Sequence, residues 1–138
     1  MRILGIDHGN KRIGLAVSDA LGMAAHGLPT LRHTSDQNTL AEIQQLVEER
    51  EIAEIVVGLP LNMDGSEGEQ TEKVRAFAAL LQQIGKPIHF LDERLTSERA
   101  HRTMSEAGLK RRKHKQHVDR MAAQFILQTY LDMNRPAL

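Results

Sequence analysis

The segment RILGIDHGNKRIGLAVS, Arg2–Ser18, contains two short runs of aliphatic and β-branched residues on either side of a polar turn sequence. The runs span residues 2–7 and 13–18, and the Gly9-Asn10 pair between them is typical of a turn. We therefore predict that the chain opens with a β-hairpin, on which the rest of a sheet is built.

The residues after the hairpin predict a mixed α/β fold. Residues 24–31 form a third extended run, and Pro29 suits an edge strand because proline has no backbone N–H to donate. Beyond it, apolar residues at helical spacing alternate with compact apolar runs. Buried strands that are each reached through a helix indicate parallel pairing by right-handed crossovers. The expected elements are a helix at 38–50, a strand at 54–58, a helix at 70–84, a strand at 88–92, and helices at about 96–107 and 118–132.

Length and composition indicate one globular domain. The chain has 138 residues, of which 41% are hydrophobic and 26% are charged, so we expect residues 1–138 to share a single core. It has no cysteine, which excludes disulfides and thiolate metal sites. The apolar run before Asp7 is much shorter than a signal peptide or a membrane span of about 20 residues requires. We therefore expect a cytoplasmic protein without a membrane segment.

Charge is balanced overall but concentrated in one segment. The formal net charge is zero, yet five fixed positive charges fall between residues 110 and 115, and the remainder of the chain is net acidic. A local basic patch favours nucleic-acid phosphates, although a solvated surface loop has the same composition. We expect a flexible loop that orders on the substrate. Its phosphate-binding residues would be Lys110, Arg111, Arg112, Lys113 and Lys115.

Three carboxylates fall at the ends of predicted elements. Asp7 ends the first strand, Glu93 follows the last strand, and Asp119 lies at the beginning of the final helix. In parallel sheets, ligands bind beyond the carboxyl ends of the strands. Each residue also has an ordinary structural explanation, since aspartate is common in turns and acidic side chains stabilise helix N-termini. As a set, they predict a catalytic and metal-binding site.

A divalent cation would balance these three carboxylates. Oxygen ligands suit Mg²⁺ or Mn²⁺, whereas Zn²⁺ more often recruits histidine or cysteine. The seven histidines include no helical H-x-x-x-H pair, so no zinc site is predicted, and His8 is interpreted as a supporting neighbour of the carboxylates. The expected cofactor is Mg²⁺ or Mn²⁺, held by Asp7, Glu93 and Asp119 and used to hydrolyse phosphodiester bonds.

Two turn sequences supply further candidates for substrate binding. Lys11 and Arg12, in the predicted hairpin turn, could position a phosphate beside Asp7, and the loop after the strand at 54–58 offers Asn62. Paired basic residues in a turn are also often simply solvated, and asparagine is common in ordinary turns. We take Lys11, Arg12 and Asn62 as predicted substrate-binding residues.

Four motifs are spread over nearly the whole chain. They are DHGNKRIGLA at 7–16, VGLPLNMDGS at 57–66, DERLT at 92–96, and Val118-Asp119 followed by Ala122-Ala123 and Ile126-Leu127-Gln128. In this order they resemble the YqgF/RuvX family of pre-16S ribosomal RNA nucleases, which are also described as similar to Holliday junction resolvases. A chance match to one short pattern would not reproduce four motifs in the family's order.

The resemblance implies a ribonuclease H-like fold, with a mixed five-stranded sheet flanked by helices, and a role in maturing the 5′ end of 16S rRNA. It implies catalytic carboxylates at Asp7, Glu93 and Asp119, the positions already singled out by their placement. The expected partner is nucleic acid, as precursor 16S rRNA or the ribosomal particle, bound by a monomer or homodimer. Junction resolvases carry an acidic residue near the end of the fourth strand, where this chain has Gly58.

Three alternatives remain open at this point. A Holliday junction resolvase would act on branched DNA, and two-fold symmetric binding would require a dimer. A nucleic-acid-binding assembly or transcription factor would bind without catalysis. Residues 7–16 also resemble the phosphate-binding hairpin of actin-like and sugar-kinase ATPases, which need a second domain to enclose the nucleotide.

Overall fold

Strands and helices make up most of the described chain. The computed structural model describes residues 1–96 and 111–134, with the backbone alone for residues 111–120. Residues 93–96 begin a helical turn directly after the last strand. The strands are β1 (Arg2–His8), β2 (Arg12–Ser18), β3 (Ala25–Arg32), β4 (Ile52–Leu59) and β5 (Ile88–Asp92). The helices are α1 (Asp36–Glu49), α2 (Glu69–Leu81), the short 3₁₀ helix η1 (Gln82–Ile84) and α4 (Arg111–Met133).

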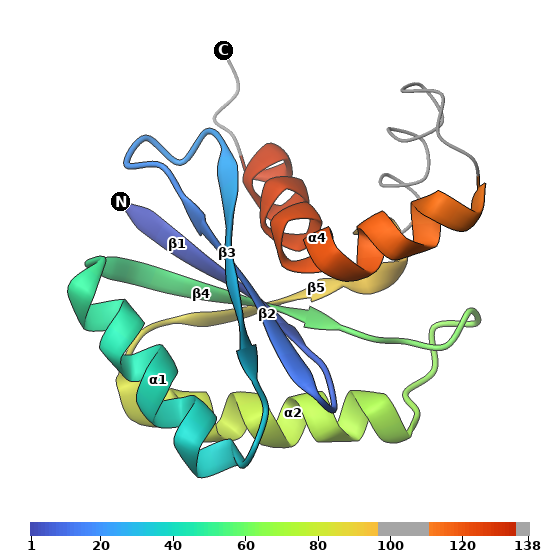
Figure 1. The fold of residues 1–138 in the computed structure, drawn as a ribbon, viewed down its shortest axis with the longest axis horizontal. Coiled ribbons are helices and arrows are strands. Elements are labelled where there is room, and N and C mark those ends of the chain that lie inside the picture. Colours follow the sequence, from blue (N-terminus) through green and yellow to red (C-terminus); the bar gives the residue numbers. More distant parts are fainter. Residues whose placement is uncertain (97–110, 135–138) are drawn as a thin grey trace.

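The five strands form one mixed sheet in the order β3-β2-β1-β4-β5. β1 pairs antiparallel with β2, and β2 with β3, while the β1–β4 and β4–β5 pairs are parallel. Helices α1 and α2 cover one face of the sheet, and α4 covers the other (Figure 1). The predicted fold class is confirmed, and β3 lies at the edge as Pro29 indicates. Of the helices in the described ranges, none combines the length and apolar character that a membrane crossing requires.

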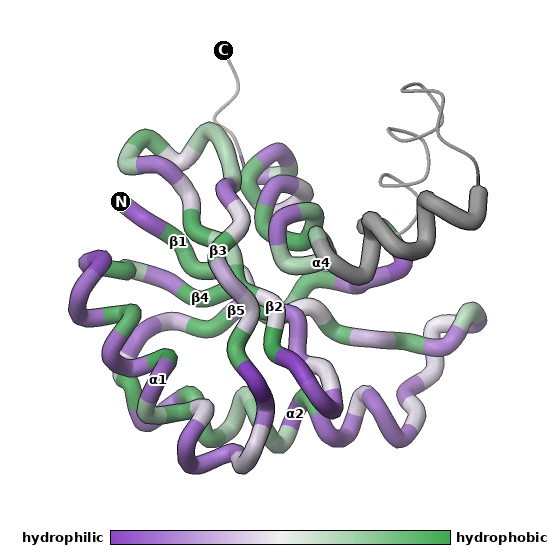
Figure 2. Tube along the Cα trace, viewed as in Figure 1, coloured by the Kyte–Doolittle hydropathy of each residue, from purple (hydrophilic) through white to green (hydrophobic). Residues whose placement is uncertain are grey.

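Two apolar clusters lie on the two faces of the sheet, because successive residues of a strand point to opposite faces. In β1, Leu4 and Ile6 belong to the cluster beneath α1 and α2, where Phe77 is fully buried. Ile3 belongs to the cluster beneath α4, with Leu127. Figure 2 shows hydrophobic stretches along the strands, while hydrophobic and hydrophilic residues alternate along α1 and α2. Asp7 therefore faces α4, and His8 faces the opposite side.

Glycines on the sheet let α4 approach closely. A Cβ added at Gly5 would lie 2.8 Å from the Cβ of Leu127 and 3.1 Å from the backbone oxygen of Ala123. A Cβ at Gly14 would lie 3.5 Å from the Cβ of Ala123 and 3.4 Å from that of Asp7. The helix backbone thus packs directly on the hairpin beside Asp7, at a distance that larger residues at these positions would prevent.

The last helix begins earlier than the sequence pattern predicts. The expected helix is 118–132 with a basic loop before it, whereas α4 is helical from Arg111. The loop prediction is wrong for the basic run within α4, because lysine and arginine are good helix formers and no glycine or proline follows Gly108 there. Lys110 and residues 97–107 of the other predicted helix lie outside the described residues. The basic residues that are helical rather than in a loop are Arg111, Arg112, Lys113 and Lys115.

Candidate active site

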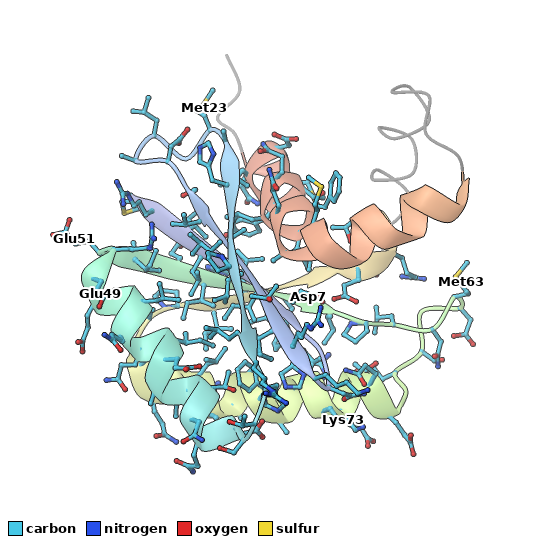
Figure 3. All side chains as sticks on the ribbon, viewed as in Figure 1. Asp7, Met23, Glu49, Glu51, Met63 and Lys73 are labelled. Carbon is cyan, nitrogen blue, oxygen red and sulfur yellow. The ribbon has the colours of Figure 1, made fainter. Side chains whose placement is uncertain are left out.

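Asp7 and Glu93 meet on the face of the sheet that α4 covers. Asp7 is the penultimate residue of β1, Glu93 follows β5 directly, and their carboxyl groups are hydrogen-bonded to each other. β4 lies between these two strands. Asp7 sits near the middle of the molecule, where the sheet passes under α4 (Figure 3). Two of the three predicted carboxylates are therefore in direct contact.

The contact changes the acid–base behaviour of Glu93. Burial, followed by the negative charge of Asp7 and the hydrogen bond to it, raises the pKa of Glu93 from 4.5 to about 8. Two carboxylates this close cannot both ionise in the absence of a positive charge, so the pair shares a proton at neutral pH. A divalent cation between them would replace that proton and allow both groups to ionise.

Gly58 explains how Glu93 reaches Asp7 across β4. In the parallel register, Gly58 pairs with Leu91 of β5, and the preceding Val57 pairs with Ile6 of β1. A Cβ at Gly58 would lie 2.6 Å from Oε1 of Glu93. The space that a side chain at position 58 would take is thus occupied here by the carboxyl end of Glu93. In the sequence, this glycine departs from the resolvase pattern. In the structure, its lack of a side chain leaves room for the Glu93 carboxyl group.

Asp119 belongs to the α4 backbone, and its side chain lies outside the described residues. Residues four apart share a helix face, so Asp119 is on the face of Ala123, one turn earlier. Ala123 is buried against the sheet beside Gly14, which itself adjoins Asp7. The backbone therefore directs this face of the helix toward the carboxylate pair. The role of Asp119 stays a prediction.

The loop after β4 is held together by its own side chains. The amide of Asn62 donates to Oγ of Ser66 at 2.9 Å, and the backbone N–H of Gly65 donates to the carbonyl of Asn62 at 2.8 Å. Asp64 accepts from the backbone N–H and the hydroxyl of Ser66, which lower the pKa of its carboxyl. The Asn62 side chain is thus engaged within the loop, and its contact with substrate stays a prediction.

Arg94 fastens this loop to the end of β5. Its guanidinium makes a forked contact with Asp92, at 3.1 Å from Nε to Oδ1 and 2.6 Å from Nη2 to Oδ2, and donates to the carbonyl of Met63 at 3.2 Å. This hydrogen bonding lowers the pKa of Asp92. Arg94 belongs to the DERLT motif, but no role for it is predicted from the sequence. Its spacing from Asp92, the last residue of β5, is the signal that could have predicted this ion pair from the sequence.

An open cleft of about 660 Å³ lies at the tip of the hairpin that carries Asp7. Lys11 and Arg12 line it, as does Arg32 at the end of β3, a residue that the sequence motifs do not single out. Arg12 and Arg32 are partners in the β2–β3 register, which brings their backbones side by side. Three cations around one cleft form a surface suited to phosphate groups.

His8 does not support the carboxylates, contrary to the sequence interpretation. It follows Asp7 in β1 and therefore points to the other face, where its ring packs on Phe77 with centroids 4.6 Å apart. Burial, and next the charge of His33, lower its pKa. His8 and the carboxylate pair thus belong to different environments although they are adjacent in sequence.

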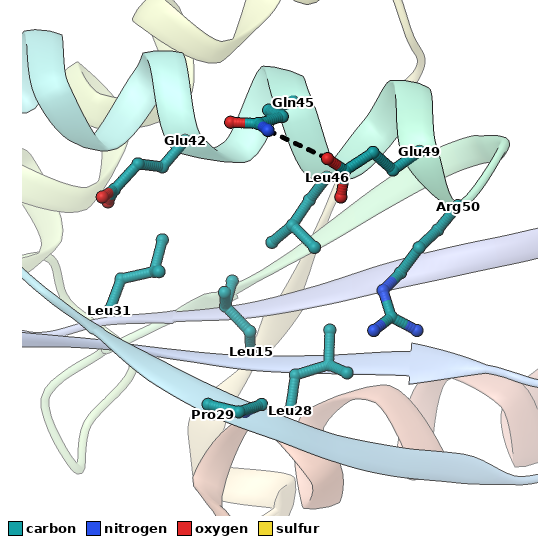
Figure 4. Close-up of a pocket in the computed structure, with 9 residues that line it drawn as sticks. All are labelled: Leu15, Leu28, Pro29, Leu31, Glu42, Gln45, Leu46, Glu49 and Arg50. Carbon is teal, nitrogen blue, oxygen red and sulfur yellow. Dashed lines mark hydrogen bonds between the residues drawn. The ribbon is translucent and has the colours of Figure 1, made fainter.

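A separate apolar groove of about 320 Å³ lies between α1 and strands β2 and β3 (Figure 4). Leu15, Leu28 and Leu46 line it, and Glu49 stands at its border, where it accepts a hydrogen bond from Gln45 at 2.9 Å. This groove is on the α1 side of the sheet and holds none of the predicted catalytic residues. The predicted catalytic carboxylates therefore lie apart from this groove.

The mixed sheet in this strand order, with helices on both faces, is a ribonuclease H-like fold. The relatives reported below make the chain a nuclease, a hydrolase of phosphodiester bonds. The structure of T. thermophilus RuvC in complex with a Holliday junction substrate has the same fold, with a TM-score of 0.63 at 18% sequence identity. The match covers 97% of this chain and 96% of that one. At this level of identity, the likeness shows the shared fold.

Sequence relatives define the family. The model of the RuvX family, described as Holliday junction resolvase, matches residues 1–133, and the chain belongs to this family. A protein of Moorella thermoacetica named "Putative pre-16S rRNA nuclease" is 52% identical over 133 residues, which cover 96% of this chain and 95% of that protein. A Myxococcus xanthus protein with the same name is 47% identical over 137 residues, or 99% of this chain and 91% of that protein.

Proposed function

We propose that this chain is a metal-dependent nuclease that processes the 5′ end of precursor 16S rRNA during ribosome assembly in the cytoplasm. The observation that carries the proposal is the hydrogen-bonded pair of Asp7 and Glu93 beneath α4. Bringing two partly buried carboxyl groups together is costly unless a positive charge balances them, so the arrangement is one that function rather than stability explains. The names of the relatives supply the RNA substrate.

The donor set of the site fits Mg²⁺ or Mn²⁺. Asp7 and Glu93, with Asp119 as the proposed third ligand, offer carboxylate oxygens, the ligands that hard divalent cations prefer. The raised pKa of Glu93 supports the same interpretation, because a cation would relieve the repulsion that raises it. When bound, the cation would polarise a phosphoryl oxygen and make water a stronger nucleophile.

Basic side chains near the carboxylate pair would bind the nucleic acid. Lys11, Arg12 and Arg32 would bind phosphates next to the one that is cut, and Arg94 would keep the Met63 loop in place at the rim. In the reaction, the water oxygen forms a bond to phosphorus while the ester P–O bond breaks, and the leaving oxygen takes up a proton. The basic residues between Lys110 and Lys115 would add a second set of phosphate contacts.

Cleavage of branched DNA is the second candidate function. The family model is described as Holliday junction resolvase, and the RuvC structure with the same fold is a complex with a Holliday junction. Gly58 stands where junction resolvases carry an acidic residue, and Glu93 already fills that space. The acidic residue that the resolvase resemblance would place at this position is therefore absent from this chain, which favours the RNA substrate.

The proposal is tested by incubating a precursor 16S rRNA 5′ fragment and a four-way DNA junction with the protein in Mg²⁺, in Mn²⁺ and in chelator. The wild type is compared with Asp7→Asn and with Glu72→Gln, a matched control that neutralises an exposed carboxylate of α2. The molecular mass in solution is measured on the same samples, because a junction resolvase requires a symmetric dimer.

Metal-dependent cutting of the RNA by wild type and Glu72→Gln, with loss in Asp7→Asn, is the expected result. Cutting of the junction alone, by a dimer, would establish the second candidate instead. Binding of either nucleic acid without cutting by any of the three proteins would contradict both and identify a binding module.

A further inference from the structure

A second group of polar side chains lies on the face of the sheet opposite the carboxylates. His8 ends β1, His33 follows β3, and Asp36 is the first residue of α1. One ligand atom from each of these three residues lies within 4.8 Å of the other two, and Nε2 of His33 is 3.1 Å from Oδ1 of Asp36. The three residues come from separate elements, so only the folded chain brings them together.

His8 is the member of this group that ordinary packing leaves unexplained. The residue is only 9% exposed, and neither ring nitrogen has a hydrogen-bond partner in the described part of the chain. Buried polar side-chain atoms nearly always have a partner. The His8 ring meets that of His33 edge-on, with centroids 5.1 Å apart, and one of its ring nitrogens lies within 4.8 Å of ligand atoms of His33 and Asp36. A missing ligand for that nitrogen would explain its burial.

Thr39 orients His33 for metal binding. The buried Thr39, in α1, places its hydroxyl 3.0 Å from Nδ1 of His33. If Nδ1–H donates this bond, Nε2 carries the lone pair, on the side of Asp36. Histidine ligands of metals commonly donate their other ring N–H to such a fixed oxygen. The hydroxyl therefore fixes the orientation of the ring, and a cation that replaced the proton between Nε2 and Asp36 would select the tautomer that a ligand needs.

The site also has a route to solvent. His33 lines the open cleft at the hairpin tip, and Asp36 is nearly half exposed, so an ion can enter from that side. Ligands at about 2.0–2.1 Å from a tetrahedral Zn²⁺ are roughly 3.4 Å apart. The pair His33 and Asp36 already has this spacing, and His8 would have to move by no more than about 1.5 Å.

We propose that His8, His33 and Asp36 form a binding site for one Zn²⁺ ion, separate from the carboxylate site at Asp7 and Glu93. Two imidazoles and one carboxylate are a ligand set that Zn²⁺ commonly uses, with water in the fourth position. The ion would tie the end of β1 to the start of α1. The absence of a helical H-x-x-x-H pair predicts no zinc site from the sequence, whereas these ligands are distant in sequence and meet only in the fold. The proposed zinc site does not depend on the nuclease activity.

Zn²⁺ binding to the purified full-length chain is measured after removal of metal by a chelator, by competition against a chromogenic zinc indicator. The variants are His33→Ala and His8→Phe, whose phenyl ring keeps the packing on Phe77. The matched control is His26→Ala, an exposed histidine of β3 outside the group. We expect one Zn²⁺ per chain in wild type and control, and binding at least about 100-fold weaker in the two variants, because even outer-shell changes cost about 10–100-fold.

Further variants separate this site from the carboxylate site and from a folding defect. Asp7→Asn should bind Zn²⁺ as wild type does, and Thr39→Val, which keeps the shape of the buried side chain, should weaken binding by about 10–100-fold. Unfolding curves in chelator show which variants are folded, and Co²⁺ absorption spectra of wild type and His8→Phe report the nitrogen ligands directly. Equal Zn²⁺ affinity in wild type and folded His33→Ala or His8→Phe, or loss of Zn²⁺ binding in Asp7→Asn alone, would overturn the proposal.

Discussion

The carboxyl groups of Asp7 and Glu93 are hydrogen-bonded to each other although strand β4 lies between the strands that carry them. Gly58 makes this contact possible, because a Cβ at that position would lie 2.6 Å from the Glu93 carboxyl. The site thus depends on the carboxyl groups of Asp7 and Glu93 and on the absence of a Cβ at Gly58. Its chemistry and its stability can be tested separately at each of these positions.

Replacing Glu93 by glutamine should stabilise the metal-free protein and abolish cleavage. The amide cannot ionise, so the penalty of a buried charge next to Asp7 disappears, whereas one ligand of the proposed cation is removed. We expect a higher Tm in chelator at pH 8 and a cleavage rate lower by at least about a hundredfold. Thermal unfolding and single-turnover cleavage are measured on the variant beside Glu72→Gln. A lower Tm with retained cleavage would show that the pair is structural.

The stability of the metal-free protein should fall as the pH rises from about 4.5 to about 8. Between its ordinary pKa of 4.5 and its folded value of about 8, Glu93 holds a proton in the folded chain but not in the unfolded chain. The folded state therefore binds more protons, and its stability decreases by at most about 1.4 kcal/mol per pH unit from this residue. Urea unfolding at several pH values, with and without Mg²⁺, measures the slope.

The same measurement has an internal control. In Glu93→Gln the contribution of this residue to the slope should vanish, and in wild type saturating Mg²⁺ should reduce it, because the cation displaces the proton. Affinity for Mg²⁺ should accordingly increase with pH up to about 8. A wild-type slope identical to that of Glu93→Gln would rule out the shared proton.

Gly58→Ala should damage both packing and catalysis. The added methyl would lie 2.5 Å from Cδ1 of Ile126 as well as against Glu93, so the variant should lose about 1–3 kcal/mol of stability and most of its cleavage activity. Gly27→Ala, in β3, is the matched control, since its Cβ would meet only the Gln124 side chain at 3.5 Å. Denaturant unfolding and cleavage assays compare the two. Equal effects of both substitutions would show that the space at Gly58 is not specific.

Arg94→Lys should loosen the loop after β4 while leaving global stability within about 1 kcal/mol, since the ion pair with Asp92 is partly exposed and lysine keeps the charge. Lysine keeps the charge but cannot make the forked contact with Asp92 and reach the carbonyl of Met63 at once. We expect faster amide hydrogen exchange at Gly65 and several-fold lower kcat/KM. Arg75→Lys, at the exposed pair with Glu67, is the control and should change neither.

Neutralising Lys11 and Arg12 together should weaken nucleic-acid binding and its salt dependence more than turnover. Removal of one cation that binds a phosphate reduces the slope of log K against log salt by roughly 0.7–0.9. Filter binding at several salt concentrations measures this slope, with Lys73→Gln on the exposed side of α2 as control. An unchanged slope with lower turnover at saturating substrate would place these residues in the chemistry and not in binding.

Much of the architecture follows from patterns that are local in sequence. The strand at 88–92 is found where it is predicted, and Asp7 and Glu93 meet because parallel strands end at the same edge of a sheet. The predicted start of the last helix is too late, because a basic run has the composition of a solvated loop although lysine and arginine are good helix formers. Local pattern thus predicts the elements better than their boundaries.

Relationships between distant residues are harder to predict. Which side of β1 a residue faces depends on which helix covers that side, so sequence proximity groups His8 with Asp7 although His8 lies against Phe77. The group of His8, His33 and Asp36 forms only when the edge strand and α1 are placed beside β1. Gly58 illustrates the same limit, because its importance comes from a side chain 35 positions away in the sequence, that of Glu93.

The close packing of α4 on Gly5 and Gly14 has a consequence while the chain is being synthesised on the ribosome. Asp7 leaves the ribosome long before Ala123, which covers this part of the hairpin. In a nascent chain, Asp7 and Glu93 therefore stay uncovered until α4 has been synthesised. Under the proposed function, the order of synthesis delays the complete metal site, because Asp119, its proposed third ligand, is made after Asp7 and Glu93.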